Sequence, residues 1–279
     1  MECRHNITYW NLGEYLGLGL GAASYLGGFR FENERDFATY QEIQKERKLQ
    51  SEERITASKV PCDVTKEYLW GYQEIHRESC QDEMEEFMFL GLRMCCGVSR
   101  KAFYKRFGIE LLFGVELNIL DIDGHLDLND ELLGELDYAI ASMHAQNYNS
   151  GTIAENTSAY LNAMTHPCVK VLGHCDNPAF PVDYETLAVG AKENGVIFEI
   201  NEASLAPYGY RGDTRANNQE ILKYCMKYEI PIVLSSDSHG VGHIGDFTCA
   251  AEFVHEMMFP EKMILNNDIP RLKMILSER

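Results

Sequence analysis

Residues 169–174, VKVLGH, decide the fold, because a short apolar run suited to a buried strand ends there in a histidine. The same form recurs in residues 113–116 (FGVE), 138–144 (YAIASMH) and 232–239 (IVLSSDSH). Where β-strands alternate with α-helices in a barrel, functional side chains come from the carboxyl ends of the strands, so residues far apart in sequence meet on one face. The recurrence therefore predicts an α/β fold with polar side chains gathered at one end of its strands.

Composition limits the class of protein. The 279 residues, 45% of them hydrophobic, suffice for one large domain or two ordinary ones. No apolar stretch reaches the roughly 20 residues of a membrane span, and the first residues lack the basic-then-apolar order of a signal peptide, so we expect a cytoplasmic protein with no membrane partner. The net charge of −18 argues against non-specific nucleic-acid binding, which needs Lys and Arg to displace counterions from phosphates.

The charge is distributed unevenly along the chain. Residues 1–108 hold 15 basic residues (Lys and Arg) and 17 acidic residues (Asp and Glu). Residues 109–279 hold 10 basic and 26 acidic residues. This shift predicts a boundary near Gly108, with a smaller α+β segment before it. We interpret most of the acidic side chains as a solvated surface; the alternative is that some of them hold cations.

Local patterns predict the elements of the first segment. Residues 36–54 and 82–94 are helix-prone, the latter with acids in its first turn, and Ser99 is placed to cap a further short helix. Residues 55–80 are expected to be irregular. The alternating glycines of residues 17–21 (GLGLG) favour a close backbone approach or a bend in an extended segment over a helix. A nucleotide-binding loop is the weaker alternative, because the spacing is not Gly-x-Gly-x-x-Gly.

After residue 108, predicted strands and helices alternate, which is typical of a parallel sheet or barrel. Asp183 is suited to cap a helix that stops at Gly195, and a strand follows over residues 196–201. A second helix is expected over residues 213–228, before the strand that ends at Asp237.

The side chains at these strand ends are of the kinds that bind divalent metal ions. Imidazole and carboxylate together suit zinc, manganese or iron, and such ions activate water and stabilise phosphoryl transfer. Glu116 could bridge two ions, and His144 and His174 would each give one nitrogen. Asp237 and His239, two apart on an extended strand end, are expected to point to the same side. Four of the histidines without this placement, which we interpret as surface or packing residues, are His76, His125, His166 and His255.

From about residue 109 to its end, the chain resembles the PHP (polymerase and histidinol phosphatase) metal-dependent phosphoesterases. The matching motifs are GVELN (114–118), ASMH (141–144), GHCDNP (173–178), FEIN (198–201) and SDSH (236–239). The resemblance implies a distorted βα barrel with up to three zinc, manganese or iron ions that hydrolyse phosphate esters. By position it implies the metal ligands Glu116, His144, His174, Asp237 and His239, with Glu116 and Asp237 as the catalytic carboxylates.

The chain departs from that family at the start of the barrel. A complete member begins with a strand bearing His-x-His and a second strand with further histidines, whereas no two histidines here lie two residues apart. About two strands and half of the usual ligands are absent. The expected fold is therefore a partial PHP-type barrel with an open edge.

Residues 1–108 resemble a different family. The motifs CRHNxxYW (3–10), YLGLG (15–19) and EEFMFLGLR (85–93) are similar to the C-terminal part of oxygen-independent coproporphyrinogen III oxidase-like radical SAM proteins, including their heme-chaperone branch. Those proteins carry a Cys-x-x-x-Cys-x-x-Cys motif that this chain lacks, so we expect neither SAM nor an iron–sulfur cluster. Relative to that family, residues near 55–80 resemble an insertion.

These features predict a metal-dependent phosphoesterase of the histidinol-phosphatase type acting on a small phosphorylated substrate. Arg211 and Arg215 are candidate phosphate contacts, and a surface position without such a contact is an equal alternative. Two other classes of function stay open. One is a non-catalytic fusion or remnant of two truncated proteins, and the other is heme binding through the first segment and His5.

Overall fold

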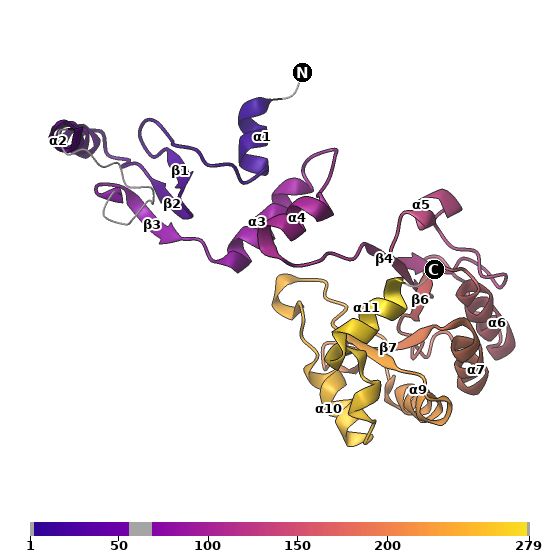
Figure 1. Cartoon of the computed structure of the whole chain (residues 1–279). Helices are drawn as coiled ribbons and strands as arrows, with labels where there is room; N and C mark the ends of the chain where they lie inside the picture. The colour runs from indigo at the N-terminus through magenta and orange to yellow at the C-terminus, as the bar shows by residue number, and fades with distance from the viewer. Residues whose placement is uncertain (1–2, 56–68, 278–279) are drawn as a thin grey trace. The chain divides into compact units, whose positions relative to one another are not determined.

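The computed structural model describes residues 3–55 and 69–277. It divides into two compact units, Met1–Leu111 and Leu112–Arg279 (Figure 1). The sequence predicts its boundary near residue 108, in the same connecting stretch. Which family each unit comes from stays a prediction at this point.

The first unit is built on an antiparallel sheet with strand order β1-β2-β3. Its elements are α1 (Arg4–Trp10), β1 (Ala23–Leu26), β2 (Phe29–Glu32), α2 (Phe37–Ile55), β3 (Gln73–Arg77), α3 (Cys80–Gly91) and α4 (Arg100–Phe107). Helix α4 begins after Ser99, whose side chain accepts from the N–H of Ala102, as predicted. Residues 73–77, expected to be irregular, form β3 instead. The rest of that stretch, residues 56–68, lies outside the described residues.

The glycine-rich stretch before β1 makes the close backbone approach that its pattern predicts. A Cβ atom on Gly17 would lie 2.2 Å from the carbonyl oxygen of Ala23. The side-chain amide of Asn33 donates to the carbonyls of Gly17 and Gly19. Because Asn33 is buried and satisfied by these carbonyls, the stretch is a packed structural loop in the first unit.

The second unit is an α/β domain, which confirms the predicted class. Its elements are β4 (Gly114–Asn118), α5 (Asp130–Gly134), β5 (Tyr138–Ser142), α6 (Ile153–Met164), β6 (Val169–Leu172), α7 (Tyr184–Asn194), β7 (Ile197–Asn201), α8 (Glu202–Leu205), α9 (Arg215–Tyr228), β8 (Ile232–Ser235), η2 (Val241–His243), α10 (Thr248–Glu256), η3 (Glu261–Met263), η4 (Leu265–Asn267) and α11 (Ile269–Ser277). The five strands pair in parallel in the order β4-β5-β6-β7-β8, so each strand neighbours the next one in sequence.

The capping residues set the bounds of the elements around the sheet. The side chain of Asp183 accepts from the N–H of Thr186, and Gly195 ends α7 with a φ of 67°, so that helix begins and stops where the sequence predicts. Helices α6, α7 and α9 follow one another along the outside of the sheet (Figure 1). Strand β8 differs from the prediction, because it ends at Ser235 and not at Asp237.

Apolar side chains cover both faces of this sheet. Leu172 and Phe198 belong to the main core, which includes residues of α6, α7, α9 and α10. Their neighbours Val171 and Ile197 point to the opposite face and pack with Leu276 of α11. Burial on both faces is what a parallel sheet requires. It leaves the carboxyl ends of the strands as the place where polar side chains can gather.

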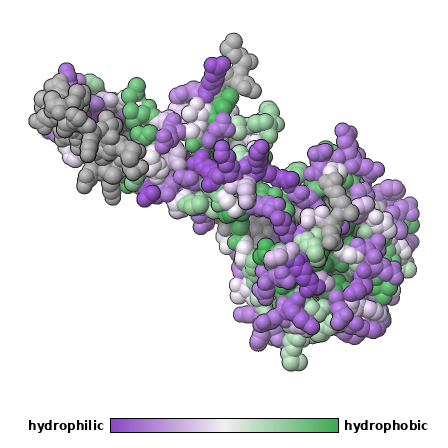
Figure 2. All heavy atoms as spheres, viewed as in Figure 1, coloured by the Kyte–Doolittle hydropathy of each residue, from purple (hydrophilic) through white to green (hydrophobic). Residues whose placement is uncertain are grey.

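Strand β4 stands at one end of the sheet order, and among the described residues no strand pairs with its outer side. This agrees with the expected partial barrel. Polar and charged side chains cover much of the face of the second unit in view (Figure 2). No helix within residues 3–55 and 69–277 combines the length and the apolar composition needed to cross a membrane.

Candidate metal centre

Three of the predicted ligands meet on, or just beyond, neighbouring parallel strands. Glu116 is on β4, His144 follows β5 and His174 follows β6. His174 Nε2 lies 3.0 Å from Glu116 Oε1 and 3.1 Å from His144 Nε2. His144 Nε2 lies 3.5 Å from the same Glu116 oxygen. The parallel pairing of β4, β5 and β6 thus brings together residues that are up to 58 positions apart in sequence.

The spacing of these three atoms suits a metal ion. Around a tetrahedral zinc ion with bonds of about 2.0–2.1 Å, neighbouring ligand atoms are separated by roughly 3.3 Å. The three observed separations, 3.0, 3.1 and 3.5 Å, lie close to that value. Two imidazole nitrogens and one carboxylate oxygen are also ligands that zinc, manganese and iron accept. Glu116, His144 and His174 could therefore hold a divalent ion.

The electrostatics of this cluster favour the metal-binding form of Glu116 and His144, but not of His174. Burial alone would raise the pKa of Glu116, but the hydrogen bond with His174 and the charges of the two imidazoles outweigh it and lower the pKa to about 2. Burial, together with the nearby His174, lowers the pKa of His144. For His174, burial acts downward, and its contact with Glu116 raises the pKa above the ordinary value. At neutral pH Glu116 is thus a carboxylate, and His144 is neutral with a free lone pair.

A buried carboxylate that was not predicted supports His174. The backbone φ of His174 is 28°, a left-handed conformation that a residue other than glycine rarely adopts. Glu199 Oε2 accepts from the backbone N–H of His174 at 2.6 Å, and Glu199 also accepts from Ser235 and Asn201. Burial raises the pKa of Glu199. The sequence signal was a charged residue inside the apolar strand at residues 197–201, since charged side chains are rarely buried without partners.

Asp237 lies near the cluster and is held by Arg211. Arg211 Nη2 donates to Asp237 Oδ2 at 2.7 Å, and the side-chain amide of Asn201 donates to the same oxygen at 3.1 Å. The same Asn201 amide also donates to Glu199, the carboxylate that accepts from the backbone N–H of His174, which links Asp237 to the cluster. The other guanidinium nitrogen, Nη1, donates to Asn201 and Ser204. Arg211 is therefore engaged within the protein and does not stand free as a phosphate contact.

His239 and Arg215 do not join the cluster. The expectation that Asp237 and His239 point to one side assumed an extended strand, but β8 ends at Ser235 and Asp237 adopts a φ of 44°. The side chain of His239 is consequently 74% exposed. Arg215 forms an ion pair with the exposed Glu256. His239 Nδ1 nevertheless lies 3.6 Å from Asp237 Oδ1, so His239 stays beside Asp237, whereas Arg215 is engaged away from the predicted site residues.

A second group of possible ligands, Asp121, Asp123 and His125, lies in the loop after β4. One Asp121 oxygen accepts the backbone N–H groups of Asp123 and His125, and the other contacts the imidazole of His125. His125 was interpreted as a surface residue, and it is exposed. These contacts give the group a structural role in shaping the loop.

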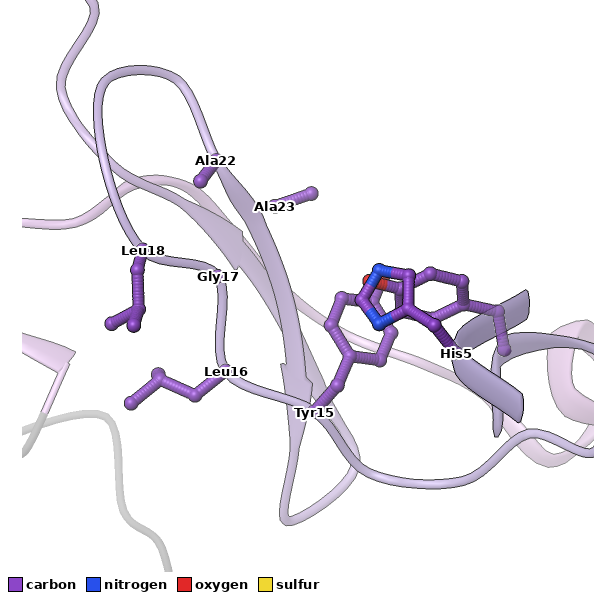
Figure 3. Close-up of a pocket in the computed structure, with 8 residues that line it drawn as sticks. His5, Tyr15, Leu16, Gly17, Leu18, Ala22 and Ala23 are labelled. Carbon is purple, nitrogen blue, oxygen red and sulfur yellow. The ribbon is translucent and has the colours of Figure 1, made fainter. Parts of the chain in front are cut away.

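In the first unit, His5 lines a pocket of about 570 Å³ together with Tyr9, Tyr15 and the start of the glycine-rich stretch (Figure 3). His5 Nε2 lies 2.7 Å from the hydroxyl of Tyr9. The ring of Tyr9 packs edge-on against that of Tyr15, with centroids 4.4 Å apart. The pocket walls are otherwise mostly apolar, with Leu16 and Leu18 among them.

Comparison with known proteins finds similarity to two kinds of protein. The family model described as the HemN C-terminal domain matches residues 79–114. A probable phosphatase of Clostridium novyi (strain NT) is 38% identical over 175 residues, which are 63% of this chain and 71% of the relative. A probable phosphatase of Clostridium botulinum (strain Hall) is 38% identical over 58% of this chain and 65% of its own length. A probable phosphatase of Thermoanaerobacter sp. (strain X514) is 36% identical over 62% of this chain and 70% of its own length.

The chain thus spans about two thirds of the length of the curated relatives it matches. Among solved structures, a chain from the cryo-EM structure of archaeal ribonuclease P with mature tRNA matches 63% of this chain and 72% of its own length. That match has 17% identity and a TM-score of 0.42.

Proposed function

Because the chain belongs to the family of the probable phosphatase of Clostridium novyi over 63% of its length, we propose that it is a metal-dependent phosphoesterase acting on a small phosphate monoester. The observation that carries this proposal is the convergence of Glu116, His144 and His174 on one point at separations of 3.0–3.5 Å. A phosphatase family and a metal-ligand cluster at the carboxyl edge of a parallel sheet support the same chemistry from independent directions.

The residues of this chain would prepare the site in three ways. Glu116 offers an ionised carboxylate and His144 a neutral imidazole, so neither has to lose a proton to bind an ion at neutral pH. Glu199 holds the backbone of His174 in its left-handed conformation. Arg211 fixes the carboxylate of Asp237 beside the cluster. A bound divalent ion would lower the pKa of a water molecule and polarise the phosphate oxygens.

The order of the strand-end residues supports the PHP type within this proposal. Glu116, His144, His174 and Asp237 occur in the sequence order of the motifs that resemble that family. Three side chains converge closely, and Asn201 links Asp237 to Glu199, which supports His174. This set suits one firmly held ion better than several, because each ion needs about four ligands, of which three come from the protein in catalytic sites.

The test is metal content combined with hydrolysis of para-nitrophenyl phosphate. We expect protein purified without chelator to hold about one zinc, manganese or iron ion per chain, and hydrolysis to stop when a chelator is added and return with the metal. A content well below one ion per chain, with no hydrolysis in added zinc or manganese, would favour the non-catalytic alternative.

A second candidate function belongs to the first unit and rests on its pocket. His5 could serve as an axial ligand to heme, and the apolar lining with Tyr9 and Tyr15 suits a flat aromatic ligand. Titration of heme into the protein should then shift the Soret band, and His5→Ala should abolish the shift. No shift with the unaltered protein would remove this candidate.

A further inference from the structure

We propose that Asp127 and Asn118 fix the tautomer of His144, so that its Nε2 atom always presents a lone pair to the metal centre. Asn118 and Asp127 are then positioning residues that act through His144. The inference rests on the metal site proposed above. It assigns a purpose to the loop between β4 and α5, which no other feature of the site explains.

The evidence is a chain of hydrogen bonds that leads from the loop to the cluster. Asp127 Oδ1 accepts from the backbone N–H of Asn118 at 3.1 Å, and Asp127 Oδ2 accepts from the Asn118 side-chain amide. The carboxamide oxygen of Asn118 lies 2.8 Å from Nδ1 of His144. Asn118 is only partly exposed, whereas Asp127 is exposed on the loop.

Asp127 decides which way the carboxamide of Asn118 faces. An ionised carboxylate only accepts hydrogen bonds, so the NH₂ group of Asn118 must point at Asp127. A flipped amide would bring its oxygen against a carboxylate oxygen, and two acceptors in contact repel each other. The Asn118 oxygen therefore faces His144, and it is itself only an acceptor.

The orientation of Asn118 in turn fixes the proton of His144. Because Nδ1 faces an acceptor, the neutral imidazole carries its proton on Nδ1 and leaves Nε2 unprotonated. Nε2 is the atom that lies 3.1 Å from His174 Nε2 and 3.5 Å from Glu116 Oε1. Metal-binding histidines commonly donate their other ring nitrogen to such a partner, which sets the tautomer and the ring orientation.

The loop is folded in a way that returns Asp127 to the end of β4. Ile119 pairs with Leu126 in an antiparallel bridge, which places the following residue opposite Asn118. Gly124 takes a φ of 78° at the turn, and the Asp121 carboxylate accepts two backbone N–H groups there. The Asp121 carboxylate thus shapes the turn that delivers Asp127, and Asp123 takes part in it through its backbone N–H, which an alanine would keep.

The first test reads the tautomer in metal-free protein by ¹⁵N-edited NMR of the imidazole, with His144→Gln used to identify the signal. We expect the proton on Nδ1 in the unaltered protein and in Asp123→Ala, a matched loss of an exposed carboxylate from the same loop. Asn118→Leu should give a mixture of tautomers. A proton found on Nε2 in the unaltered protein would overturn the inference.

The second test is Zn²⁺ affinity, measured by competition with a chromophoric chelator. Asn118→Leu should bind Zn²⁺ about 10-fold to 100-fold more weakly, as losses of such partners generally do. Asp127→Ala should weaken binding less, because water can replace an exposed carboxylate, and Asp123→Ala should not. Equal affinity in Asn118→Leu and the unaltered protein would contradict the role of Asn118.

An exchange of the two side chains supplies the rescue. In Asn118→Asp alone, two carboxylates face each other and repel. We therefore expect both the Zn²⁺ affinity and the conformation of the loop to change. In Asn118→Asp combined with Asp127→Asn, the new amide can donate to the new carboxylate, which still accepts from His144, so the Nδ1 proton should be retained. Asp127 lies on the exposed loop, so Asp127→Ala should leave the strand intact. The His144 tautomer and the Zn²⁺ affinity of this variant therefore test the inference even where a substitution in β4 lowers stability.

These measurements separate the two proposals. If the unaltered protein binds no Zn²⁺, the metal centre fails, and the tautomer of metal-free His144 still supports or overturns the positioning role. If Zn²⁺ binds but substitutions of Asn118 and Asp127 change neither the His144 tautomer nor the Zn²⁺ affinity, the metal centre stands and the positioning role is wrong.

Discussion

Arg211 and Asp237 form a buried ion pair, with 2.7 Å between Nη2 and Oδ2 and side-chain exposures of 3% and 14%. Breaking such a pair by removing one partner leaves a buried charge uncompensated, which typically costs about 3–5 kcal/mol. We therefore expect Arg211→Met to lower the free energy of unfolding by about this amount, measured by urea denaturation of metal-free protein.

Arg215→Met is the matched control for that prediction. Arg215 pairs with Glu256 where both side chains are more than half exposed, and exposed pairs contribute about 0–1 kcal/mol. Its unfolding midpoint should therefore stay close to that of the unaltered protein. Equal destabilisation by the two substitutions would mean that Arg211 does not hold Asp237 in solution.

The next prediction concerns the ligand that two histidines share. Glu116 Oε1 lies within 3.5 Å of both imidazole nitrogens, so Glu116→Ala removes the only carboxylate of the three-residue cluster. We expect this variant to lose most of its bound metal, as measured by inductively coupled plasma mass spectrometry. His166→Ala should keep its metal, because His166 contacts Cys168 and Asp130 instead. Similar losses from both variants would count against the assignment.

Recurrence made the core of the site predictable. Each of Glu116, His144 and His174 ends an apolar run, and neighbouring parallel strands place such residues side by side. His239 could not be placed in the same way, because a two-residue period holds only while the backbone stays extended, and the φ of 44° at Asp237 ends that.

Features that depend on tertiary contacts were missed. In the sequence, Glu199 is a single charged residue in an apolar strand. Only the fold shows that its carboxylate supports the backbone of His174. The partner of Arg211 is 26 residues away, so no local pattern could distinguish it from Arg215. Strand β3 was overlooked because Gln73–Arg77 has no apolar alternation and takes its place by pairing with β2.

Tyr25 gives the first unit a measurable pH dependence. Burial, together with its hydrogen bond to Glu83, raises the pKa of Tyr25 to about 12. Its unfolded value is about 10, so the folded state holds the proton more tightly, and this contribution to stability is complete below about pH 10 and is lost as the pH rises towards 12. Tyr25→Phe cannot ionise and should lose less stability between about pH 10 and 12 than the unaltered protein.

Tyr104→Phe controls for that experiment, since Tyr104 is 59% exposed. Thermal unfolding of the two variants and the unaltered chain should be compared across the alkaline range. If Tyr25→Phe and the unaltered protein lose stability in parallel, folding does not raise the pKa of Tyr25.

The last prediction is that hydrolysis of para-nitrophenyl phosphate by this chain is slow. Among the residues the structure describes, three side chains converge on the site with Asp237 beside them, whereas a multi-metal phosphatase clamps both the attacking and the leaving oxygen with separate ions. The outer side of β4 also has no strand partner there, and water reaching the site from that side weakens each electrostatic interaction. Adding a pair of strands that bears His-x-His from a complete relative should raise turnover, whereas the same insertion with both histidines changed to alanine should not. Fast, chelator-sensitive turnover by the unmodified chain would show that its three converging ligands and Asp237 are sufficient.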